Sequence, residues 1–343
     1  MSLFRMPFMV IAAVLSMLLP SAVSANGGPL YDPADAYGLL RLDENSNISL
    51  IREKVTYTIQ NDFSDDRDAE VSVRYELKSK NDYIKTVAVL FLTPVKEQLS
   101  VTDGTRNIAT SPVSRDLPNN WYGQQKDTVT DPVSGHELPL ASRGKGEIQA
   151  EGTQFSLTFE PGESKEILIQ YKERGGMYDK GVVNTIFSHL YFLTPAEFWE
   201  GEPQVELEVF LSKPGSRLHS SLPINRMNDH AYRATFSQLP DEEWYFSYTY
   251  PKRLLYPTNV EKDHNLLILA TTLMLTAFVA SITLHFRNIW IFILGAIGIM
   301  TFTFYFISKM GGYPFNDIFV GLTDIAVGSL LVWCFIKLRK RME

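Results

Sequence analysis

The sequence predicts a mostly β ectodomain, one or two antiparallel β-sandwich modules, followed by an α-helical membrane segment of three transmembrane helices. Apolar and polar residues alternate along much of the chain before residue 264, which is typical of half-buried strands. Turn-forming residues separate these segments, and helical periodicity is scarce among them. Residues 265–336 are instead mostly apolar. A water-soluble part and a membrane part therefore share one chain.

Residues 1–25 have the pattern of a secretory signal peptide. Arg5 precedes an apolar run over 9–19, and Val23 and Ala25 place small residues at a cleavage site. The alternative is an uncleaved anchor, although the run is shorter than the ~20 residues that a spanning helix needs. Either outcome places the following chain outside the cytoplasm.

A first β-sandwich module is predicted over residues 26–174. Two of its alternating segments flank a turn at Pro161–Gly162 and predict a hairpin. Residues 103–150 are rich in turn formers and charge, and predict a long loop between strands. The predicted inward-facing residues are Val55, Tyr57, Ile59, Val71, Val73, Tyr75, Leu77, Phe155, Leu157, Phe159, Ile167, Ile169 and Tyr171.

A second β-rich module is predicted over residues 175–262, with the boundary at Gly175 and Gly176. Two further alternating segments support it, with apolar or aromatic residues at every second position. Their inward-facing residues are Val205, Leu207, Val209, Leu211, Trp244, Phe246, Tyr248 and Tyr250.

Three apolar segments, 265–286, 289–307 and 318–336, are each long enough to cross a bilayer. The link between the first two is so short that these helices must form a tight antiparallel pair. If the chain starts outside, three crossings put the basic tail 337–343 in the cytoplasm. The positive-inside rule favours the same orientation. The predicted location is the cell membrane, multi-pass, with an extracytoplasmic N-terminal domain and a cytoplasmic C-terminus.

Composition argues against several classes of function. The net charge of −7 gives little support for nucleic-acid binding. Cys334 is the single cysteine, so neither an intrachain disulfide nor a multi-cysteine metal site is expected. The chain lacks HExxH, GxSxG and GxxxxGK[ST], which weighs against the common enzyme classes. We expect no cofactor.

Two ectodomain motifs are weak candidates for binding. Four oxygen-bearing side chains at alternate positions resemble the start of a calcium loop, but its glycine and final glutamate are absent, which favours a solvated acidic turn. An aromatic pair in the long loop either contacts a glycan or protein or fastens the loop to the sandwich. The candidates are Asp62, Ser64, Asp66 and Asp68 for metal, and Trp121 and Tyr122 for contact.

Asp324 is the most informative residue of the membrane segment, because an ionisable side chain within a bilayer is costly unless it is paired, protonated or wet. Gly321 and Gly328 share its helix face and would allow close approach of another helix. Thr272 and Thr276 form a small-residue seam on the first helix. These residues are candidates for a helix interface; the alternative is that Asp324 lies near enough to the surface to reach water.

These features favour a membrane-anchored extracytoplasmic binding or assembly protein at the cell surface, without enzymatic activity. The expected partners are the lipid bilayer and a membrane or envelope protein. An accessory or core subunit of a transport or signalling complex is the first alternative, since one helix would suffice for anchoring. An extracytoplasmic enzyme is the second alternative.

Overall fold

The computed structural model describes residues 31–32, 36–41, 46–59, 67–92, 99–104, 106–115, 128–139, 150–251, 254–307 and 315–342. They belong to two compact units. The sandwich unit comprises Leu30–Tyr178 and Thr185–Tyr250, and the helical unit contains Asp179–Asn184 and Pro251–Glu343.

The first sheet of the sandwich unit has the strand order β1-β13-β14-β2-β5-β11-β8, and β19 pairs with both β14 and β16. Its pairings are antiparallel except that between β14 and β2. The strands are β1 (Tyr31–Asp32), β2 (Ala36–Arg41), β5 (Lys85–Leu92), β8 (Ser111–Arg115), β11 (Ala150–Phe159), β13 (Gly176–Tyr178), β14 (Ile186–Tyr191), β16 (Arg217–Ser220) and β19 (Trp244–Thr249).

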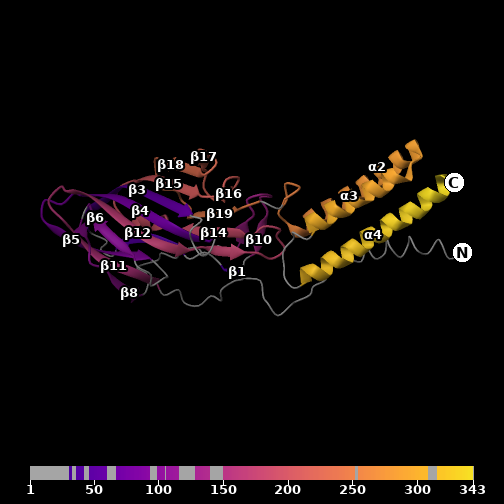
Figure 1. Ribbon diagram of the computed structural model, residues 1–343. Helices are drawn as coiled ribbons and strands as arrows, with labels where there is room; N and C mark the ends of the chain where they lie inside the picture. The colour runs from indigo at the N-terminus through magenta and orange to yellow at the C-terminus, as the bar shows by residue number, and fades with distance from the viewer. Residues whose placement is uncertain are drawn as a thin grey trace. The chain divides into compact units, whose positions relative to one another are not determined.

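The second sheet has the order β17-β18-β15-β3-β4-β12-β6-β7, with its longest strands at the centre. Figure 1 shows β3, β4 and β12 side by side. The pairing of β15 with β3 is parallel, and the others are antiparallel. The strands are β3 (Ile48–Ile59), β4 (Asp68–Ser79), β6 (Ser100–Asp103), β7 (Arg106–Asn107), β12 (Ser164–Arg174), β15 (Gln204–Leu211), β17 (Asn225–Arg226) and β18 (Ala231–Phe236).

Side-chain alternation explains how the two sheets pack. Val55 lies opposite Val73, and Val73 lies opposite Ile169, so apolar residues of three central strands align on one face. The first sheet contributes Phe91 and Trp244 to the same buried cluster. The core therefore lies between the inner faces of the two sheets, as in a β-sandwich.

The predicted fold class, a mostly β part with three long apolar helices, is confirmed. The described strands before and after residue 174 share both sheets, because β15 pairs with β3 and β14 pairs with β2. They form one sandwich, whereas a boundary between two modules was expected at this point. Gly175 lies where the chain passes from β12 in one sheet to β13 in the other.

The predicted hairpin around Pro161–Gly162 is wrong in its pairing, although the two strands and the turn are present. β11 pairs with β5 and β8, whereas β12 pairs with β4 and β6. The turn therefore connects the two sheets. Alternation places apolar residues of both strands on inner faces but carries no information about which strand each one pairs with.

Part of the predicted loop 103–150 has regular structure. β9 (Thr128–Thr130) and β10 (Glu137–Pro139) form a two-stranded hairpin. Asp131 closes its turn by accepting hydrogen bonds from the backbone N–H groups of Val133 and Ser134, at 3.1 and 3.3 Å. The Ser247 hydroxyl of β19 donates to the Thr130 carbonyl at 2.5 Å, which fastens the hairpin to the first sheet.

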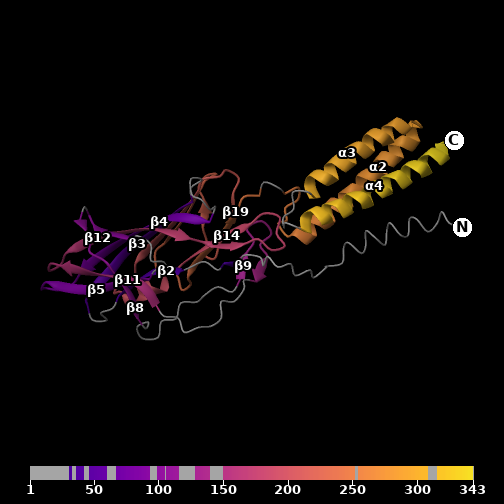
Figure 2. The same cartoon turned by 60° about the horizontal axis from the view of Figure 1, so that its bottom comes forward.

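In the part of the chain that the structure describes, three helices are long and apolar enough to cross a membrane. They are α2 (Glu261–Phe286), α3 (Ile289–Ile307) and α4 (Phe315–Met342), and they lie side by side in Figure 2. The first and third begin earlier than predicted. The third also continues through most of the basic tail, because Lys and Arg are good helix formers.

The tight link between α2 and α3 confirms the predicted helix pair. Arg287 adopts the left-handed conformation with φ of 48°, and its N–H reaches the Thr283 carbonyl, which ends α2. Asn288 then accepts a hydrogen bond from the Trp290 N–H at 3.0 Å and caps α3.

A second feature of the helical unit precedes α2, where Asn259 fastens the segment Asp179–Asn184. Its side-chain oxygen accepts from the Asn184 N–H at 2.8 Å, and its amide donates to the Asn184 carbonyl at 2.9 Å. Val183 then packs with Ile268 of α2 and Ile307 of α3. A short segment between β13 and β14 thus completes the core of the helical unit.

Candidate functional site

Most of the predicted ectodomain candidates lie outside the described residues. This applies to Trp121 and Tyr122, and to Asp62, Ser64 and Asp66. Asp68 is the first residue of β4. Among the residues that the structure describes, no group of three or more His, Cys, Asp or Glu side chains could hold a metal ion.

The structure places Asp324 within α4, where its Oδ1 is buried without a hydrogen-bond partner among the described residues. A Cβ added at Gly321 or Gly328 would meet nothing within 4 Å, so the described helices leave space at both glycines. The unsatisfied oxygen and the two open glycines belong to the same helix.

The predicted seam on α2 packs against α3. Thr272 and Thr276 are buried, and the hydroxyls of Thr272 and Thr303 are 3.0 Å apart. The closely packed glycine of this contact is Gly295, where an added Cβ would collide with Val279. Gly295 could not be singled out in the sequence, because spacing alone does not show which of several glycines meets a neighbouring helix.

A turn between β4 and β5 presents two large apolar residues to solvent. The exposed fraction is 54% for Tyr83 and 59% for Ile84. Asn81, which precedes the exposed pair, is buried: its side-chain amide donates to the Ser46 carbonyl at 2.8 Å, and its backbone carbonyl accepts from the Gly162 N–H at 3.1 Å. The hydrogen bonds of Asn81 hold the preceding chain, so the exposed pair is presented from an ordered turn.

The outer face of the second sheet carries a network of ion pairs. The Lys54 Nζ lies 3.0 Å from Glu206 and 2.8 Å from Glu208, and Arg233 pairs with the same two carboxylates. These residues come from β3, β15 and β18. Because the charges satisfy one another across strands, this face has little net attraction for a charged ligand.

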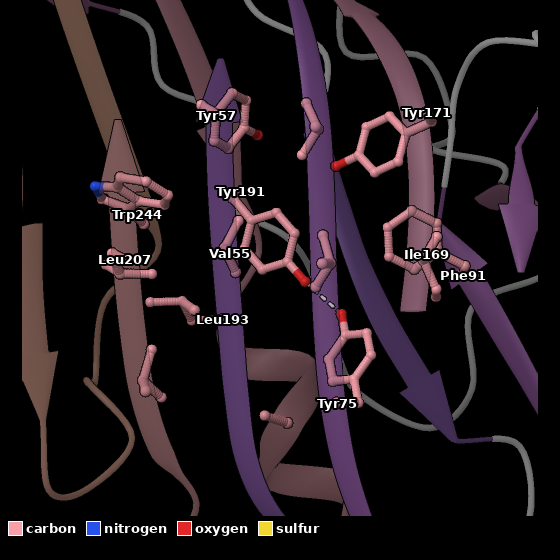
Figure 3. Packing of buried hydrophobic residues seen from close by; sticks show 14 of the residues in the cluster. Val55, Tyr57, Tyr75, Phe91, Ile169, Tyr171, Tyr191, Leu193, Leu207 and Trp244 are labelled. Atoms are coloured by element: carbon pink, nitrogen blue, oxygen red, sulfur yellow. Dashed lines mark hydrogen bonds between the residues drawn. The ribbon is translucent and has the colours of Figure 1, made fainter. Parts of the chain in front are cut away.

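The sandwich interior contains a carboxylate, Glu53, whose surroundings are neutral or acidic. The Tyr191 hydroxyl donates to Glu53 Oε1 at 2.7 Å. The Tyr75 hydroxyl contacts the Tyr191 hydroxyl, and Figure 3 shows this contact between the two tyrosines. Glu53 Oε2 is buried without a partner among the described residues. Burial raises the pKa of Glu53 to about 7, although the two tyrosine hydroxyls act in the opposite direction.

A second buried carboxylate, Glu173 of β12, has stronger partners. The His189 Nδ1 lies 2.7 Å from Glu173 Oε1, and the Tyr57 hydroxyl donates to Oε2 at 3.0 Å. The His189 ring stacks on Phe246 with their centroids 5.2 Å apart. A Cβ at Gly175 would lie 2.6 Å from His189 Cε1, so the ring requires a glycine here.

A third carboxylate, Glu243, lies just before β19 and holds the 3₁₀ helix η1 (Thr194–Phe198). It accepts from the N–H groups of Leu193 and Thr194 at 2.6 and 3.1 Å, and from the Thr194 hydroxyl. Burial raises its pKa, and these hydrogen bonds oppose the rise. Glu243 in turn acts electrostatically on Glu53 and further disfavours its charge.

The interior acids went unnoticed in the sequence, although side-chain parity could have revealed two of them. Glu53 precedes Val55 by two residues, and Glu173 follows Tyr171 by two, so both occupy inward positions of alternating strands. His189 is likewise inward on β14. Since Glu53, Glu173 and His189 are buried, this arrangement can take up a proton or hold the sheets together, but it does not meet a solute in solution.

Comparisons with known proteins add fold-level likenesses. No family model matches the chain, and no curated protein matches it. A Legionella pneumophila protein proposed to bind nutrients matches with a TM-score of 0.45 and 12% identity, over 64% of this chain and 71% of that one. Yeast LTA4 hydrolase matches with a TM-score of 0.36 and 11% identity, over 67% and 32%.

A third similar structure is the M1 zinc metallopeptidase of Deinococcus radiodurans, with a TM-score of 0.28 and 10% identity, over 60% of this chain and 43% of the peptidase. This chain thus corresponds to less than half of either enzyme. At these identities and TM-scores, the likenesses carry no argument about activity.

Proposed function

We propose that this chain is a membrane-anchored, extracytoplasmic binding or assembly protein without enzymatic activity. Three helices of membrane-crossing length support the anchoring. The basic residues at the end of α4 support a cytoplasmic C-terminus and, with three crossings, a sandwich unit on the opposite side of the bilayer. The signal-peptide pattern of residues 1–25 supports the same orientation.

A binding role is supported by the turn between β4 and β5. Exposed aromatic and aliphatic side chains on an ordered turn bring contact area at a small cost in conformational entropy. Tyr83 and Ile84 meet this description, and the exposed turn is the observation that carries the proposal. The burial of Glu53, Glu173 and His189 supports a non-enzymatic role, because these groups cannot reach a substrate in this conformation.

The test is affinity purification of the intact protein from its native membrane after chemical cross-linking. We expect the double substitution Tyr83→Ala and Ile84→Ala to reduce a co-purifying envelope or membrane protein by about tenfold, as for a modest interaction hot spot. Met227→Ala is the matched control, because Met227 is similarly exposed in the segment joining β17 and β18. Equal recovery with both variants would contradict binding through this turn.

The arrangement around Asp324 favours a second candidate function, a subunit of a membrane complex that docks through α4. A polar partner from another helix would satisfy the buried oxygen, and Gly321 and Gly328 would allow that helix to approach closely. This role is compatible with binding through the sandwich unit, because the two surfaces belong to different units.

Replacing Asp324 with Asn tests this second role. We expect the complex extracted in mild detergent to become smaller by native gel electrophoresis, because the carboxylate no longer attracts its partner. Asp263→Asn is the control, since Asp263 is exposed in the first turn of α2. An unchanged complex at unchanged abundance would exclude docking through Asp324.

A further inference from the structure

Glu53 lies at a junction between the two sheets. It comes from β3, hydrogen-bonds to Tyr191 of β14, and through it connects with Tyr75 of β4. β3 and β4 belong to the second sheet and β14 to the first. One chain of hydrogen bonds thus crosses the core at a point that is closed to solvent.

The groups facing Glu53 make its ionised form energetically unfavourable. Tyr75 from β4 and Tyr191 from β14 are neutral, and burial raises the pKa of each hydroxyl well above its usual value. Glu243, before β19, is the charged group that acts on Glu53 among the described residues. A buried carboxylate without a cationic partner is destabilising unless it is protonated.

The hydrogen-bond chain accommodates either protonation state of Glu53, but only the protonated state is free of a buried charge. With Glu53 ionised, Tyr75 donates to Tyr191 and Tyr191 donates to Glu53, which leaves Oε2 unsatisfied. With Glu53 protonated, the same chain can run in reverse, from the acid to Tyr191 and on to Tyr75. The reversed chain removes the buried charge and keeps both inter-residue hydrogen bonds.

We propose that Glu53 is a proton-controlled joint between the two sheets. Its contact with the opposite sheet holds the sheets firmly together when the carboxyl group is protonated and weakens when the group ionises. The sandwich unit would therefore respond to the pH of the compartment it occupies. The raised pKa of about 7 places this transition near neutrality. A carboxyl group with a raised pKa stabilises the fold fully below its unfolded value, near 4.5, and loses that contribution as the pH rises towards 7.

Hydrogen–deuterium exchange on the full-length protein in lipid nanodiscs tests the joint. After correction for intrinsic exchange rates, protection of amides in β3 and β14 should fall by at least about tenfold between about pH 5 and about pH 8.5. In Glu53→Gln this fall should shrink to less than about twofold, because glutamine does not titrate. Glu166→Gln on the exposed face of β12 should behave like the unaltered protein.

A fall in protection that persists in Glu53→Gln, or is absent from the unaltered protein, would overturn the proposal. Tyr191→Phe provides an independent measurement if the glutamine variant does not fold. Losing the hydroxyl that stabilises the carboxylate should move the midpoint of the transition to higher pH. Infrared difference spectroscopy of the buried acid C=O stretch would report that midpoint directly, and an unmoved midpoint would also contradict the joint.

Discussion

Two buried carboxylates of the sandwich unit show how neighbours decide what an interior acid does. Glu173 has a histidine nitrogen and a tyrosine hydroxyl on its two oxygens, from His189 and Tyr57. Glu53 has a single hydroxyl donor, from Tyr191, and a second oxygen without a partner among the described residues. The Glu173 arrangement ties the strands together through hydrogen bonds on both oxygens. The Glu53 arrangement becomes destabilising when its carboxyl group ionises near neutral pH.

The difference teaches that burial alone does not predict the role of an ionisable residue. Both acids come from central strands of one sheet, and both point into one core. What separates them is that Glu173 is paired with a histidine of the opposite sheet and a tyrosine of its own sheet, whereas Glu53 accepts from one tyrosine of the opposite sheet. Removing Glu173 should therefore lower the stability of the fold. Neutralising Glu53 should instead raise it at neutral and alkaline pH, because a buried charge is removed.

The largest effect is expected for Glu173→Ala. The substitution leaves the His189 ring nitrogen and the Tyr57 hydroxyl buried without their acceptor, and should lower the free energy of unfolding by about 3–5 kcal/mol. Denaturant unfolding of the intact protein, followed by tryptophan fluorescence, measures it. Glu166→Ala, at an exposed pair with Arg74, should cost less than about 1 kcal/mol. Equal losses in the free energy of unfolding would contradict the distinction between the buried Glu173 arrangement and the exposed Glu166–Arg74 pair.

A smaller effect is expected for Gly175→Ala, which adds a Cβ against the His189 ring that pairs with Glu173. The new Cβ would lie 2.6 Å from both His189 Cε1 and the Ser188 carbonyl oxygen, so the ring and backbone must shift at a cost of about 1–3 kcal/mol. A double-mutant cycle with His189→Ala, read by thermal unfolding, separates the two contacts. Strictly additive costs would show that the ring does not require the glycine.

Much of the fold could be predicted because it depends on local patterns. Alternation located the inner faces of β3, β4, β11, β12 and β15, and apolar length located the three helices. Strand pairing was harder to predict, since β11 and β12 follow each other along the chain yet belong to different sheets. Choice of partner depends on contacts between distant segments, which alternation does not encode.

The candidate sites also differ in whether the local sequence reveals them. Asp324 could be noticed because a carboxylate in an apolar helix is conspicuous in the sequence itself. Glu53 was missed because charged residues are common in strands, although it shares the inward parity of Val55. The tyrosines that face it come from other strands and cannot be identified from its local sequence. The exposed pair Tyr83 and Ile84 was also missed, because two apolar residues after a strand do not reveal whether they are buried.

The sequence by itself determined that a β-rich part precedes three apolar helices, because side-chain period and hydropathy are properties of consecutive residues. Only the tertiary structure decided that the strands form one sandwich, and that Glu173 has a partner on each oxygen whereas Glu53 has one on Oε1 alone among the described residues. Those outcomes depend on which side chains meet across the core, and residues far apart in the chain bring them together. Glu53 and Tyr191 are 138 positions apart, yet their oxygens lie 2.7 Å from each other.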